Sequence, residues 1–202
     1  MVRVYEDTPR GEAMERAVAT LREGGVIIYP TDTLYAVGCA LDNARGAERI
    51  MQLKGLKRKS DRLTFLCDSI SMVAEYARVS NANFRLLRDN LPGPFTFVLP
   101  GMNRVPNHCL SRRKTVGVRI PANAIARGLV EALGMPLVTG SLPVEEGAPE
   151  YGVYPELMQQ KWGALVDLVV DGGPGQMQAS TVVDATAEPV EILREGKGEL
   201  LW

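Results

Sequence analysis

The chain carries two different spacings of apolar residues, which predict helices interleaved with strands. Between Gly11 and Glu23 apolar residues recur about every 3.6 positions and Gly24-Gly25 follows, which is typical of a helix and its stop. Val26 to Tyr29 is a short β-branched run bounded by turn residues, which predicts a buried strand. The same patterns predict further helices over residues 43–53, 69–77, 81–90, 123–133 and 155–162. They predict further strands over 63–67, 95–99, 115–120, 136–139, 165–170, 181–184 and 190–193, and a loop over 145–154. Helices and strands do not strictly alternate, so we expect an α/β fold with a twisted open mixed sheet flanked by helices.

Composition narrows the class of protein further. The 202 residues show no internal repeat, low-complexity tract or linker, which predicts a single domain over 1–202. The net charge is −1, so any nucleic-acid surface must come from a local basic patch. The three cysteines lack metal-ligand spacing, no apolar run is long enough to cross a membrane, and the N-terminus shows no signal-peptide pattern. We therefore expect a cytoplasmic protein with no membrane partner and reduced thiols.

Polar residues follow the strand predicted at Val26 to Tyr29. Thr31, Asp32 and Thr33 place two hydroxyls and a carboxylate within three residues, at the end of a strand where α/β proteins bind ligands. The same residues are also typical of a turn, because Asp and Thr side chains bond nearby backbone groups. This segment alone leaves a turn and a ligand site equally open.

Other strand ends carry polar residues of the same kinds. Arg119 interrupts an apolar strand, and its guanidinium needs either a protein carboxylate or an anionic ligand as partner. The other polar residues at predicted strand ends are Thr139, Ser141, Ser180 and Arg194. The single histidine, His108, gives little support to a histidine triad or metal cluster. We assign no acid–base or metal-ligating residue, since hydroxyls and fixed cations suit the binding of phosphates and carboxylates.

A basic run from Lys54 to Arg62 holds five positive charges in nine residues. Such a run either neutralises phosphates or forms a solvated loop, and charge alone favours the loop.

Five strings in the chain together resemble one family. They are Tyr-Pro-Thr-Asp-Thr-x-Tyr at 29–35, Pro-Gly-Pro-x-Thr-x-Val-Leu at 92–99, Val-Gly-Val-Arg-Ile-Pro at 116–121, Ser-Thr-Val-Val-Asp at 180–184 and Ile-Leu-Arg-x-Gly at 192–196. In this order, over about residues 11–198, they resemble the threonylcarbamoyl-AMP synthase superfamily (YrdC/TsaC-like). The resemblance implies a YrdC-like fold with a positively charged concave surface.

The resemblance also implies a reaction and its residues. Family enzymes join L-threonine, bicarbonate and ATP into threonylcarbamoyl-AMP and release pyrophosphate, which feeds the t6A modification of tRNA. Mg²⁺ is expected with the ATP. Carried over by position, the implied threonine-binding residues are Thr33, Arg119, Thr139 and Ser180, with Arg119 on the carboxylate. The implied ATP-binding residues are Lys54, Thr115, Ser141 and Arg194.

Two departures from the synthase pattern leave a second interpretation open. Leu56 stands where the synthases carry the arginine of a Lys-x-Arg pair, and Pro143 stands where they carry the asparagine of Ser-Ala-Asn. Leucine cannot form an ion pair with a phosphate, and proline has no side-chain hydrogen-bond donor. The chain resembles the YciO-like branch more than the core synthases. The alternative function is thus a paralogue that binds nucleotide, tRNA or double-stranded RNA with weak or no synthase activity. The expected RNA or phosphate contacts are Lys57, Arg58, Lys59 and Arg62.

Overall fold

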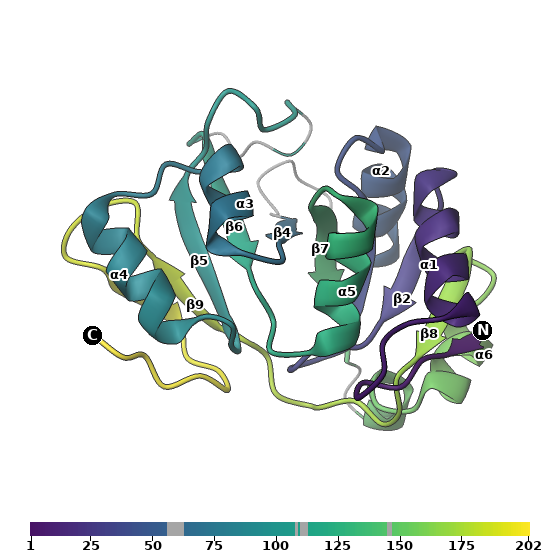
Figure 1. Cartoon of the computed structure of the whole chain (residues 1–202). Helices are drawn as coiled ribbons and strands as arrows, with labels where there is room; N and C mark the ends of the chain where they lie inside the picture. Colours follow the sequence, from purple (N-terminus) through teal and green to yellow (C-terminus); the bar gives the residue numbers. More distant parts are fainter. Residues whose placement is uncertain (56–62, 108, 110–112, 145–146) are drawn as a thin grey trace.

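The computed structural model describes residues 1–55, 63–107, 109, 113–144 and 147–202. Over these residues the chain forms one ten-stranded sheet with six α-helices and a short 3₁₀ helix (Figure 1). The helices are α1 (Glu12–Arg22), α2 (Ala44–Leu53), α3 (Ile70–Tyr76), α4 (Asn81–Asn90), α5 (Ala124–Leu133) and α6 (Pro155–Trp162), with η1 at Pro149–Gly152. The strands are β1 (Val2–Arg3), β2 (Ile27–Tyr29), β3 (Ala36–Ala40), β4 (Thr64–Leu66), β5 (Phe95–Pro100), β6 (Thr115–Arg119), β7 (Leu137–Ser141), β8 (Leu168–Asp171), β9 (Thr181–Asp184) and β10 (Glu191–Arg194).

The sheet runs in the order β1-β8-β2-β3-β7-β4-β6-β5-β9-β10. Parallel pairs such as β4 with β6 occur beside antiparallel pairs such as β3 with β7. The expected α/β class with an open mixed sheet is therefore confirmed. No helix in the described ranges is long and apolar enough to cross a membrane.

The predicted helices are all present, and side-chain caps explain most of their starts. Asn43, Ser69, Ser80 and Asn123 each accept a hydrogen bond from the backbone N–H three residues on. Such caps satisfy a donor that the first turn leaves unpaired. Helix α5 ends at Gly134, whose φ of 79° lies in the left-handed region that glycine tolerates.

Two strands, β1 and β3, were not predicted from the sequence patterns. Strand β1 has two residues, and β3 is built of small residues around Gly38, which have weak strand propensity. The segment forms strand β3 because it pairs with β2 on one side and with β7 on the other. This pairing also extends β7 to Ser141, beyond the predicted end at Thr139. Strand β8 begins at Leu168 rather than at the predicted Leu165, which is exposed.

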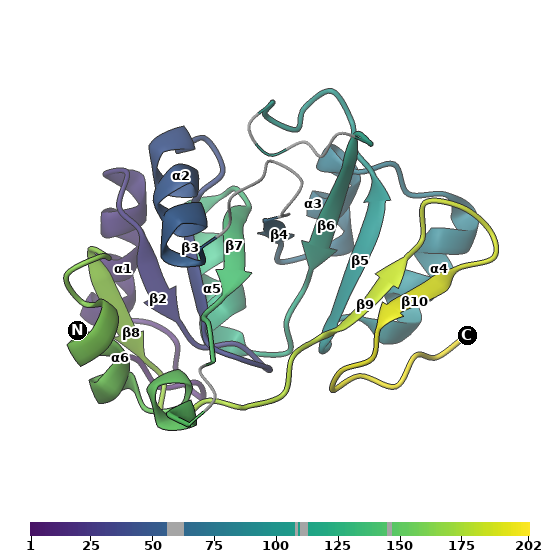
Figure 2. The ribbon, with the colours of Figure 1, turned by 180° about the vertical axis from the view of Figure 1, so that it is seen from behind.

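The helices pack on both faces of the sheet. Helices α1 and α5 share one apolar cluster with β2, β3 and β8, whereas α2, α3, α4 and α6 belong to a second cluster on the other face. Figure 1 shows α1 and α5 side by side on the part of the sheet that contains β2, β7 and β8. Figure 2, the view from behind, shows β6, β5 and β9 with no helix in front of them.

Alternation along β4, β5, β6 and β7 makes one face of this part of the sheet apolar and the other face polar. The residues that point into the second cluster are Phe65, Phe97, Val118 and Val138. Their neighbours on the opposite face are Thr64, Thr96, Gly117 and Thr139. The register places Thr64 opposite both Gly117 and Thr139, so small and polar side chains form a row across three strands. This row is the floor of the cavity described next.

Candidate functional site

A cavity of about 300 Å³ opens on the polar face of the sheet. It is lined by Thr31, Ala36, Lys54, Thr64, Leu66, Thr96, Val98, Gly117, Arg119, Thr139, Gly140, Ser141, Ser180, Val182, Leu193 and Arg194. Six of the eight predicted substrate residues are therefore brought together around one space. Thr33 and Thr115 are buried but are not among the lining residues.

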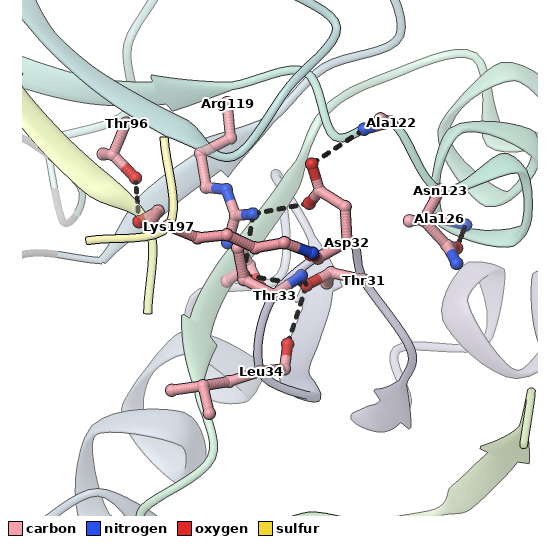
Figure 3. Close-up of polar contacts among 12 residues, drawn as sticks. Thr31, Asp32, Thr33, Leu34, Thr96, Arg119, Ala122, Asn123, Ala126 and Lys197 are labelled. Carbon is pink, nitrogen blue, oxygen red and sulfur yellow. Dashed lines mark hydrogen bonds and ion pairs between the residues drawn. The ribbon is translucent and has the colours of Figure 1, made fainter. Parts of the chain in front are cut away.

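Arg119, at the end of β6, is the buried cation of this cavity. Only 5% of the residue is exposed, and its Nη2 donates to Asp32 Oδ1 at 2.9 Å and to Thr33 Oγ1 at 3.0 Å (Figure 3). Its Nε is buried and has no hydrogen-bond partner within the described part of the chain. Burial lowers the pKa of Arg119, and the nearby Asp32 opposes this effect. The guanidinium thus has a protein carboxylate on one side and an unused donor besides.

The segment from Thr31 to Thr33 is both a turn and a wall of the cavity. Thr31 Oγ1 donates to the Leu34 carbonyl at 2.7 Å and accepts from Thr33 N at 3.0 Å. Asp32 Oδ2 accepts from Ala122 N at 3.0 Å, as Figure 3 shows. These bonds fix the turn, and Thr31 faces the cavity. The two interpretations of this segment are therefore compatible.

Thr139, on β7, is held by a buried tyrosine. Tyr29 Oη lies 2.6 Å from Thr139 Oγ1, which donates to the Val37 carbonyl at 3.2 Å. The bond to the Val37 carbonyl uses the only hydroxyl proton of Thr139, so Tyr29 is the donor in the 2.6 Å bond between the two hydroxyls. Gly38 makes room for the phenol, since a Cβ there would lie 3.0 Å from Tyr29 Cε1. The free lone pair of Thr139 is left to accept from a ligand.

Lys54 and Arg194 provide two further cations. Lys54 Nζ donates to the Ser141 carbonyl, and its side chain crosses Gly140, where a Cβ would lie 2.8 Å from Lys54 Cδ. Arg194 donates to the Ser180 carbonyl from Nη2 at 2.8 Å and from Nε at 3.2 Å. Burial, followed by the charge of Arg194, lowers the pKa of Lys54.

The cavity carries an excess of positive charge. Among the described residues that line it, Lys54, Arg119 and Arg194 are cationic and none is acidic. Asp32, just outside the lining, forms an ion pair with Arg119. After burial, which is the main cause, the charge of Arg194 adds to the lowering of the pKa of Lys54 and of Arg119, as a nearby like charge does. The site is therefore suited to ligands that carry carboxylate or phosphate groups.

Several lining residues were not predicted from the sequence. Thr64 and Thr96 face the cavity from β4 and β5, and the apolar wall comes from Val98, Val182 and Leu193. The alternation of these strands was a usable signal, since every second residue shares one face. Structural evidence for the basic-run contacts is lacking, because Lys57, Arg58, Lys59 and Arg62 lie outside the described residues, as does His108.

Comparison with known proteins places this architecture in a family. A model of the Sua5/YciO/YrdC family, described as telomere recombination, matches residues 19–196. YciO of Escherichia coli (strain K12) is 37% identical over 198 residues, covering 98% of this chain and 95% of YciO. The crystal structure of E. coli YciO superposes with a TM-score of 0.91 at 36% identity, covering 98% of this chain and 96% of that one.

Synthases and a threonine complex are also among the matches. The threonylcarbamoyl-AMP synthase of Halorhodospira halophila (strain DSM 244 / SL1) is 29% identical over 170 residues, covering 84% of this chain and 88% of the synthase. The crystal structure of P. abyssi Sua5 complexed with L-threonine has a TM-score of 0.84 at 27% identity, covering 96% of this chain and 57% of that one. The chain belongs to the Sua5/YciO/YrdC family, which includes threonylcarbamoyl-AMP synthases. The resemblance drawn from the five strings is confirmed.

Proposed function

We propose that the cavity binds L-threonine and ATP and that the protein forms threonylcarbamoyl-AMP from them with bicarbonate. The observation that carries this proposal is Arg119, a buried cation with an unpartnered Nε that lines a cavity with no acidic lining among the described residues. A carboxylate fits such a cation. The Sua5 structure with L-threonine, which has the same fold, supports the choice of amino acid.

The proposed chemistry relies on positioning and charge. The threonine amine adds to bicarbonate, water leaves, and an oxygen of the resulting carbamate attacks the α-phosphorus of ATP, from which pyrophosphate departs. Arg119 holds the threonine carboxylate, and Thr139 accepts a hydrogen bond from the amine. Lys54 and Arg194 stabilise the negative charge that builds up on the phosphates. Holding the reactants together supplies much of the rate in this type of reaction.

Magnesium would enter this site with the nucleotide. The described lining residues provide hydroxyls but no carboxylate, and the described chain holds no cluster of three His, Cys, Asp or Glu side chains. Protein-bound Mg²⁺ usually has one or two carboxylate ligands besides substrate phosphates. The residues therefore do not form a magnesium site of their own, and no step above depends on the metal.

One assay tests the synthase proposal. The pure protein is incubated with L-threonine, bicarbonate and Mg-ATP, and threonylcarbamoyl-AMP and pyrophosphate are measured. We expect both products only when all three substrates are present, and their loss in Arg119→Met. The control is Arg85→Met, which removes an exposed positive charge from α4. Absence of product above background from the unmodified protein would rule out the reaction for these substrates.

A second candidate function, nucleotide or RNA binding without efficient synthesis, rests on Pro143. This residue comes two positions after the cavity residue Ser141, which ends β7, and it has no side-chain donor. The similarity to YciO, whose name states no activity, agrees with this candidate. Binding of a labelled tRNA or RNA duplex at several salt concentrations tests it. Charge reversal at Lys57, Arg58 and Lys59 is expected to flatten the salt dependence, and an unchanged slope would exclude these residues as contacts.

A further inference from the structure

A short segment after β10 lies against the start of β9. Thr181 Oγ1 donates to the Gly198 carbonyl at 2.6 Å and accepts from the amides of Gly196 and Gly198, each at 3.1 Å. Lys197 N donates to the Ala179 carbonyl at 2.8 Å. We call residues 195–198 the C-terminal strap. Its backbone is fixed beside β9 at four points, and Lys197 provides its long cationic side chain.

The two glycines explain why the strap lies so close to the sheet. A Cβ at Gly196 would lie 2.4 Å from the Ala179 carbonyl oxygen, and one at Gly198 would lie 2.5 Å from the Phe95 ring. Both distances are shorter than van der Waals contact, so a side chain at either position would push the strap away. The Gly-Lys-Gly sequence therefore allows a close backbone contact and leaves one long cationic side chain to extend from it.

Lys197 uses this position to hold the turn after β2. Its Nζ donates to the Asp32 carbonyl at 2.7 Å. The carboxylate of Asp32 is already held by Arg119 and by the Ala122 amide. Asp32 is thus fixed from three separate segments: β6, the turn before α5 and the strap. Strands β2 and β9, which flank these contacts, lie six places apart in the sheet order, so Lys197 joins distant parts of the sheet.

We propose that Lys197 is a positioning residue for the amino-acid substrate. By holding the Asp32 carbonyl it fixes the carboxylate that orients Arg119, so that the guanidinium of Arg119 keeps its orientation beside the cavity. This inference rests on the proposed threonine site. Lys197 itself does not line the main cavity. Together with Thr31 and Asp32 it lines a separate pocket of about 130 Å³. It therefore acts through Asp32 and Arg119.

Two measurements on Lys197→Met test the inference. The first is L-threonine binding by calorimetry, which we expect to weaken about fivefold, the effect of one exposed charge-assisted hydrogen bond. ATP binding should change less than about twofold, because Lys54 and Arg194 keep their contacts. The second is hydrogen exchange at the Ala122 amide, which should accelerate because its acceptor, Asp32 Oδ2, becomes less well fixed. Lys197→Arg should restore both values, and Arg85→Met should change neither.

The outcomes separate this inference from the proposed function. If the unmodified protein binds no L-threonine, the proposed function is wrong. If it binds L-threonine and Lys197→Met binds with unchanged affinity, Lys197 has no positioning role. Unchanged exchange at the Ala122 amide in Lys197→Met would overturn the role as well, whatever the affinity.

Discussion

Replacing Asp32 by asparagine tests the buried ion pair that orients the candidate site. The Arg119 and Asp32 side chains are 6% and 10% exposed, so the charge of Arg119 would lose its partner in a largely buried place. The two carboxylate oxygens of Asp32 now accept one hydrogen bond each, from Arg119 and from the Ala122 amide. An asparagine at this position has only one side-chain oxygen and can therefore keep only one of these bonds. Removing one member of a buried pair costs about 3–5 kcal/mol. We expect a loss near the lower end, about 3 kcal/mol, because the asparagine oxygen retains one donor.

Equilibrium unfolding in urea measures this loss, and Trp162, which is buried, provides a fluorescence signal. A loss of about 3 kcal/mol corresponds to a Tm lower by roughly 6–12 °C for a chain of this length. The matched control is Asp89→Asn. It breaks a pair with Arg88 in which the Arg88 and Asp89 side chains are 60% and 40% exposed, and it should cost less than about 1 kcal/mol. Equal losses of unfolding free energy in the two variants would refute the claim that the buried Asp32 pair stabilises the fold more than an exposed pair does.

Three further predictions concern other contacts of the cavity. Gly140→Ala should displace the flexible end of Lys54 and weaken ATP binding severalfold by calorimetry, with a change in unfolding free energy below about 1 kcal/mol. The pKa of Lys54 is lowered by burial, and ATP binding needs its charged form. Affinity should therefore be lost as the pH rises through that lowered pKa, at a lower pH than for an ordinary lysine, whereas Lys54→Met should bind weakly without this loss. Tyr29→Phe removes the donor to Thr139 and should cost about 1 kcal/mol in urea unfolding; no measurable cost would contradict the assigned hydrogen bond.

Local signals made most of the fold predictable. Helix starts at Asn43 and Asn123 follow from capping chemistry, and the end at Gly134 follows from glycine's tolerance of positive φ. Strand β3 was not predictable in this way, since its small residues form a strand only because β2 and β7 pair with it. The pairing with β7 joins residues about a hundred positions apart, which no local window contains.

The site was predictable as residue types at strand ends, but not as a geometry. The need of Arg119 for a partner follows from placing a guanidinium in a strand, yet the choice of Asp32 depends on how β6 lies relative to the turn after β2. The contributions of Thr64 and Thr96 depend on the register of β4 and β5 in the sheet. Lys197 gave no signal of its own, because its role depends on how closely the flanking glycines approach β9.

In the proposed function, Arg119 receives the carboxylate of an amino-acid substrate. A crystal structure of the protein with bound L-threonine tests it most directly. We expect a threonine carboxylate oxygen within about 3 Å of a guanidinium nitrogen of Arg119, with the bond from Nη2 to Asp32 preserved. Threonine bound elsewhere, or bound in the cavity with its carboxylate away from Arg119, would contradict this role of Arg119.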